Sequence, residues 1–190
     1  MPESLVLRID ETYSIEVVDE PTYRFHFDDN RKRYDRKELF GDRHLVISCH
    51  GVVCKRNSQI MASVIFGADG GASGVHERSV VLASGVAFVA VGRYIACLQL
   101  PDLITKWVRE VDPATCFGIH FSADRLSIVS HGELEISRLT LAGDVLWQSA
   151  GRDIFSGDVL VDEAMIHAQD FNGDVYHFDL ETGKLVASSA

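Results

Sequence analysis

The sequence lacks several features that define particular classes of protein. It has no apolar run of about 18 residues, the length that a membrane-spanning helix requires, so no membrane partner is expected. Charged residues such as Glu3, Arg8 and Asp10 interrupt any export signal near the N-terminus, which predicts a cytoplasmic protein. Basic residues are also few, with 18 Lys and Arg against 28 Asp and Glu. The resulting net charge of −10 argues against nucleic acid as a partner.

Cysteine is scarce and irregularly spaced. The chain has four: Cys49, Cys54, Cys97 and Cys116. Without an export signal, we expect them to be reduced and buried. Cys49 and Cys54 are separated by four residues rather than by the two that are common in zinc sites, and no second pair repeats the spacing. The sequence therefore predicts no metal and no other cofactor; the weak candidates for a metal set are these two cysteines with His120 and His131.

Helical periodicity is nearly absent. Residues 29–40 are the one candidate helix, and their apolar side chains form no continuous face. Elsewhere, short apolar runs alternate with a period of two and are separated by Gly, Asp, Asn and Ser, a pattern typical of strands joined by turns. Such runs occupy residues 5–9, 23–27, 45–49, 86–91, 126–129 and 165–168. The sequence predicts one all-β domain over residues 1–190.

A repeat of about 40 residues runs through the second half of the chain. Trp107 and Trp147 are 40 residues apart, and Gly92, Gly132 and Gly173 recur after 40 and 41 residues. Each glycine follows one β-like run and precedes another. We therefore expect each at a hairpin turn, where glycine adopts a positive φ without steric cost. These five residues are the expected structural anchors.

Each repeat contains four predicted strands, as a propeller blade does. An inner strand precedes the central hairpin, and an outer strand follows it. The inner strands are predicted at residues 80–82, 117–121 and 158–161, and the outer strands at residues 60–66, 104–111, 144–148 and 184–188. Gly51, 41 residues before Gly92, marks a first unit whose inner strand we expect at 23–27. The domain then divides into N-terminal strands with a charged segment (1–43), a first repeat (44–79) and three clearer repeats (80–190).

Parts of these repeats resemble a known family. The stretch DFNGDVYHFDLETGKLV (residues 170–186) is similar to the repeat of PQQ-like β-propellers. LAGDVLW (residues 141–147) resembles the end of that repeat, in which the tryptophan docks between blades; Ala187 replaces it in the last unit. The likeness implies a propeller-like array of about four four-stranded antiparallel blades, either a closed small propeller or an open arc. A β-sandwich or irregular barrel is the alternative. Enzymes that use PQQ are much longer, so the cofactor is not implied.

Histidines give no clear site. If residues 172–173 form a two-residue turn, His167 and His177 lie on opposite faces of their hairpin and cannot bind one metal ion together. His120 and His131, on consecutive predicted strands, remain neighbours.

With no catalytic constellation, the sequence predicts a non-enzymatic protein-interaction module. Its acidic charge favours a basic protein, or a second copy of the chain, as the partner. The alternative is a metal- or small-molecule-binding protein, including a hydrolase, built from Cys49, Cys54, His120 and His131.

Overall fold

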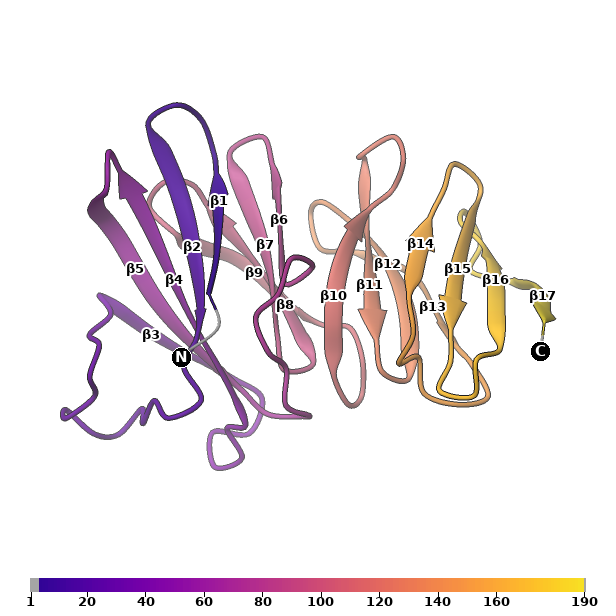
Figure 1. Ribbon diagram of the computed structural model, residues 1–190, viewed down its shortest axis with the longest axis horizontal. Coiled ribbons are helices and arrows are strands. Elements are labelled where there is room, and N and C mark those ends of the chain that lie inside the picture. Colours follow the sequence, from indigo (N-terminus) through magenta and orange to yellow (C-terminus); the bar gives the residue numbers. More distant parts are fainter. Residues whose placement is uncertain (1–3, 190) are drawn as a thin grey trace.

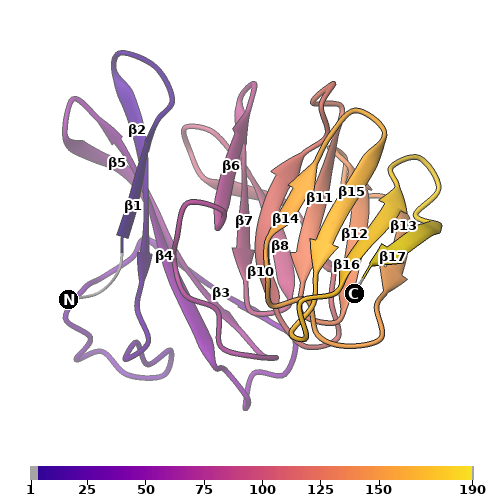
Figure 2. The same ribbon diagram turned by 45° about the vertical axis from the view of Figure 1, so that its right-hand side comes forward.

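The computed structural model describes residues 4–189, which form four β-sheets and no helix. The sheets stand side by side in chain order, and the first and the fourth sheet lie at opposite ends of the row (Figure 1). The turned view in Figure 2 shows the same separation between the first and the last sheet. The prediction of an all-β fold is confirmed. The row does not close into a ring, and none of the described residues forms a helix that could cross a membrane.

The first sheet has five strands: β1 (Ser4–Arg8), β2 (Tyr13–Asp19), β3 (Arg36–Phe40), β4 (Ser48–Arg56) and β5 (Gln59–Ala68). Their order is β1-β2-β4-β5-β3, and β3 pairs parallel to β5 while the other neighbours are antiparallel. The candidate helix at 29–40 is therefore wrong, because its second part is strand β3. The strand expected at 23–27 is also wrong, because these residues form turns outside the sheet.

Gly51 is not at a turn. It lies inside β4, and the β4–β5 hairpin turns instead at Asn57 and Ser58, whose φ values are +48° and +70°. A side chain at position 51 would collide with the hydroxyl of Tyr34, so glycine is needed there for close packing. Tyr34 and Tyr23 pack with Cys49 on the outer face of the first sheet. The segment that was expected to contribute an inner strand thus covers the end of the row.

The other three sheets share one plan, with four antiparallel strands in chain order. The second contains β6 (Val80–Ala83), β7 (Val86–Val91), β8 (Tyr94–Gln99) and β9 (Ile104–Glu110). The third contains β10 (Cys116–Phe121), β11 (Ser127–Gly132), β12 (Glu135–Thr140) and β13 (Val145–Ala150). The fourth contains β14 (Val159–Val161), β15 (Met165–Gln169), β16 (Val175–Asp179) and β17 (Leu185–Ser189). The inner strands, central hairpins and outer strands predicted for residues 80–190 all appear in these sheets, and the outer strand predicted at 60–66 lies in β5 of the first sheet.

The three anchor glycines lie at the same hairpin of their sheets but not at the same position in the turn. Gly92, with a φ of +56°, begins the two-residue turn between β7 and β8. Gly173, with a φ of +91°, is the last residue of the turn between β15 and β16. Gly132 ends β11 without a positive φ, so its expected turn conformation is wrong. Its backbone instead lies against the Asp112 carboxylate, where a side chain would not fit.

Successive sheets bury an apolar layer between them, because neither face of a single thin sheet can shield itself from water. The layer between the first and second sheets includes Val17, Phe66, Val89 and Leu98. The layer between the second and third includes Phe88, Cys97, Ile119 and Leu139. The layer between the third and fourth includes Val129, Ile136, Tyr176 and Phe178.

Trp107 on β9 and Trp147 on β13 dock onto the following sheet. The indole N–H of Trp107 donates to the carbonyl of Leu141 at 3.2 Å, and that of Trp147 to the carbonyl of Leu180 at 2.9 Å. Each ring lies against a glycine in the same turn, Gly143 or Gly183. Between the first and second sheets, Arg36 of β3 makes the corresponding contact, because its guanidinium donates to the carbonyl of Leu103.

The two ends of the row differ. The aromatic segment around Tyr23 and Tyr34 covers the outer face of the first sheet. The fourth sheet presents His167 and His177 outward, and Ala187 beside His177 is exposed where earlier sheets carry tryptophan. Among residues 4–189, no segment packs over this face (Figure 2).

Candidate functional site

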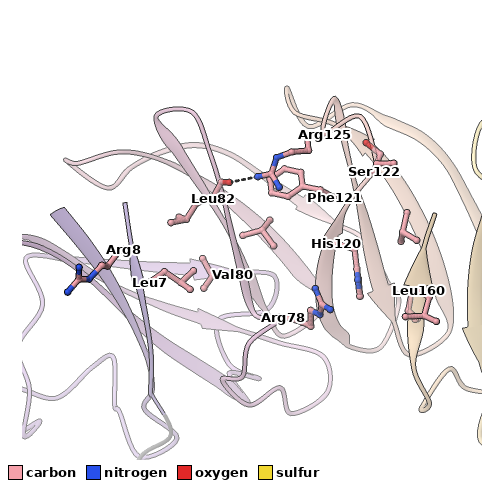
Figure 3. A pocket seen from close by; sticks show the side chains of 14 residues that line it. Leu7, Arg8, Arg78, Val80, Leu82, His120, Phe121, Ser122, Arg125 and Leu160 are labelled. Atoms are coloured by element: carbon pink, nitrogen blue, oxygen red, sulfur yellow. Dashed lines mark hydrogen bonds between the residues drawn. The ribbon is translucent and has the colours of Figure 1, made fainter. Parts of the chain in front are cut away.

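The first strand of each sheet contributes to one groove along the row (Figure 3). Strand β1 supplies Leu7 and Arg8, and β6 supplies its first three residues together with the preceding Arg78. The end of β10 supplies His120, the turn after it supplies Arg125, and β14 supplies all three of its residues. The groove has a volume of about 630 Å³, within the range of roughly 300–1,000 Å³ typical of ligand sites.

The charge of the groove is opposite to that of the whole chain. Arg8, Arg78 and Arg125 are among the 14 residues that line it, and none of the 14 is Asp or Glu. Arg125 is held in place, because its Nη2 donates to the carbonyl of Leu82 at 3.0 Å and its guanidinium lies 4.0 Å from the ring centre of Phe121. The guanidinium of Arg78 makes no hydrogen bond or ion pair with the side chains that the structure describes. The groove therefore holds one fixed and one available guanidinium.

His120 is a buried polar side chain of the groove, at 8% exposure. Its ring lies beside Arg78 (Figure 3), and within residues 4–189 its Nε2 has no hydrogen-bond partner. Burial lowers the pKa of His120 to about 4, and the positive charge of Arg78 acts in the same direction. The imidazole is consequently neutral near pH 7, with a polar atom that lacks the partner a buried group normally finds.

A second hollow adjoins the groove and shares Arg78 and His120 with it. Unlike the groove, this hollow is lined by carboxylates, those of Glu77 and Asp158. His131 also lines this hollow; its Nε2 contacts the carbonyl of Phe155 at 2.9 Å, and burial lowers its pKa. The combined surface is thus basic along the groove and mixed in charge at the end where the second hollow opens.

The structure does not assemble the candidate metal set. Cys49 and Cys54 face opposite sides of β4, one toward the outer aromatic cluster and the other toward the layer between the first two sheets. His120 and His131 belong to the third sheet, with ring centres 6.4 Å apart. In the described part of the chain, no three His, Cys, Asp or Glu side chains are placed to hold a metal ion.

All four cysteines are free and at most 4% exposed, which predicts unreactive thiols in the folded protein. Burial raises the pKa of Cys49 and of Cys97 to about 11 and that of Cys116 to about 12, so little thiolate forms near pH 8. We expect Ellman's reagent to modify no thiol in buffer and four per chain in denaturant. Rapid modification of one thiol in buffer would contradict this burial.

The two histidines of the fourth sheet lie on the same face, contrary to the sequence prediction. The β15–β16 turn has three residues, 171–173, rather than two, so His167 pairs directly with His177. Their Nδ1 atoms are 2.7 Å apart, and His167 Nε2 lies 3.0 Å from the Asp162 carboxylate. This contact with His167 lowers the pKa of Asp162 to about 2. The three residues form a hydrogen-bonded chain on the outer face of the fourth sheet.

Arg78, Arg125 and Leu160 were not identified as functional residues from the sequence. Each lies in or beside a predicted inner strand: Arg78 two residues before 80–82, Arg125 four residues after 117–121, and Leu160 within 158–161. The repeat in the sequence could therefore have indicated these residues, because the inner strands of successive units lie along a common surface.

Comparisons with known proteins support the fold alone. No family model and no curated protein matches the chain. The solved structure of the computationally designed Ika8 protein is similar, with a TM-score of 0.55 and 11% identity over 79% of this chain and 47% of Ika8. That of the computationally designed Ika4 protein has a TM-score of 0.51 and 10% identity over 63% of this chain and 77% of Ika4. The chain thus spans about half the length of Ika8.

Proposed function

We propose that this chain is a non-enzymatic protein-interaction module and that the groove is its binding surface. The observation that carries the proposal is the convergence of first strands from all four sheets on one concave surface. Leu160 adds an apolar side chain that is 64% exposed to a groove that arginines also line. Apolar contact combined with arginine is typical of the centres of protein interfaces.

The row of sheets suits this task as an open, propeller-like array. Three sheets share the strand order of a blade, and the tryptophan contacts repeat from one junction to the next. Such stacking holds the inner strands rigidly, so a partner meets a surface that loses little conformational freedom on binding. Four unpaired thiols favour the reducing cytoplasm as its location.

A matched pair of variants tests the proposal. Leu160 in the groove and Val186 on β17 outside it are both 64% exposed, so Asp at either position should leave the fold intact. We expect a partner protein to co-purify with the native chain and with Val186→Asp from the cells that make it, but not with Leu160→Asp. Each protein is purified at low and at high salt, because salt weakens a contact made by exposed charges.

The outcomes separate clearly. A partner lost only from Leu160→Asp supports binding in the groove, especially when the purified partner binds the native chain directly. Equal recovery with both variants would place the interface elsewhere and remove the groove from the proposal. If nothing binds the native chain at either salt concentration, the interaction function itself is wrong.

A further inference from the structure

We infer that the groove recognises an acidic segment of a partner protein, with a carboxylate held by Arg78 and His120 and a neighbouring apolar side chain packed on Leu160. This inference rests on the proposed function and adds the chemistry of the partner. It starts from the contrast between a groove without carboxylates and a chain with a net charge of −10.

Arg78 is the group best placed to bind an anion. It is exposed at the groove, and its guanidinium has no hydrogen-bond or ion-pair partner among the side chains of the described residues. A carboxylate accepts two parallel hydrogen bonds from a guanidinium, and such charge-assisted bonds are stronger than neutral ones. Arg125, fixed by Leu82 and Phe121, adds positive charge without having to be ordered on binding.

His120 supplies the second, independent observation. Its side chain is more than nine-tenths buried, it lines the groove beside Arg78, and its Nε2 lacks a partner among residues 4–189. Leaving a buried polar atom unpaired costs roughly 1–3 kcal/mol, so such atoms are rare in folded chains. Because Nε2 is enclosed as the ring stands, the ring turns on binding so that its N–H donates to a carboxylate oxygen held by Arg78, which removes the deficit.

The apolar part of the groove favours a peptide over a simple anion. Val80, Leu82 and Leu160 line it next to the charged groups, and the groove crosses strands from all four sheets. A free phosphate or acetate would leave this surface uncovered. A membrane or a nucleic acid carries charge far beyond the groove and would be repelled by the acidic remainder of the chain, whereas a short segment with few carboxylates is not.

The probe is a rhodamine-labelled, acetylated octapeptide of alternating Glu and Leu, with Lys/Leu and Gln/Leu peptides as comparisons. Binding to the full chain is followed by fluorescence anisotropy. We expect the Glu peptide to bind more tightly than both others and to weaken as salt rises. Arg78→Gln should weaken it about tenfold or more, the equivalent of one strong charged hydrogen bond. Arg43→Gln, which removes an exposed arginine outside the groove, should leave it unchanged.

A double variant, Arg78→Gln with Arg125→Gln, should abolish preference for Glu over Gln peptides. Circular dichroism of each variant checks that the sheets are retained. Equal effects of Arg78→Gln and Arg43→Gln would overturn the inference, as would displacement of the peptide by phosphate or acetate at similar concentrations. If no peptide binds but Leu160→Asp still loses the cellular partner, the acidic segment is wrong and the interaction function stands. If both tests are negative, both proposals fail.

Discussion

Replacing Asp112 by Ala is expected to lower the free energy of unfolding by about 3–5 kcal/mol, the largest loss we expect from any single side chain. Asp112 is 1% exposed and joins the second sheet to the third. Its Oδ1 accepts the backbone N–H groups of Ala114 at 2.6 Å and Thr115 at 2.9 Å. Its Oδ2 accepts those of Leu134 and Glu135, both at 2.8 Å. Alanine would leave four backbone donors without an acceptor.

Two further variants identify the cause. Asp112→Asn keeps the size of the side chain but turns an N–H₂ group toward two backbone donors, so we expect most of the loss to remain. Asp144→Ala removes an exposed carboxylate near Thr140 and should change stability by less than about 0.5 kcal/mol. Urea unfolding measures all three. A loss below about 1 kcal/mol for Asp112→Ala would show that these hydrogen bonds do not hold the junction.

The Trp147→Ala variant is expected to lose about 3 kcal/mol, because the half-buried ring fills the contact between the third and fourth sheets. Its N–H bond to Leu180 would also be lost. Gly183→Ala disturbs the same contact through the residue on which the ring packs. The φ of Gly183 is +68°, and the added methyl group would lie 2.5 Å from the Trp147 ring. Both variants should therefore destabilise the protein.

Hydrogen exchange shows where the Trp147 contact acts. Each sheet touches only its neighbours, so we expect the loss of protection to concentrate in β14–β17 and to be smaller in the first two sheets. Leu146→Ala, a neighbouring change at a side chain that is 50% exposed, serves as the control and should cost little. Uniform loss of protection along the chain would contradict a contact confined to the last junction.

The sequence predicted the parts of the fold that depend on local pattern. Alternating apolar runs and turn residues are close in sequence, so the strands of the last three sheets followed from them. The first sheet depends on distant contacts instead. Strand β3 pairs parallel with β5, with Arg36 opposite Val64. Parallel strands are not joined by a short turn, so no local sequence pattern indicates this pairing. Gly51 is required because the Tyr34 ring packs against it, not because it lies at a turn. Its spacing from Gly92 therefore resembles the repeat although its role differs.

The candidate site was harder to predict than the fold. A turn with one residue more than expected shifted the β15–β16 register and moved His177 to the same face as His167. The groove depends on how whole sheets stack, and stacking brings Arg78 and Arg125 into one groove although 47 residues separate them. Net charge describes the entire surface and conceals such a local reversal of sign.

The contrast between the covered first sheet and the bare fourth sheet gives the molecule a direction in which it can be lengthened. A duplicate of one repeat inserted before β1 would have to displace Tyr23 and Tyr34 from their packing. A duplicate fused after β17 meets no such obstacle. Ala187→Trp would supply an indole that packs on the added repeat, as Trp107 and Trp147 pack on the sheets that follow them. Protein engineers could therefore build longer relatives of this chain by tandem fusion at its C-terminal side.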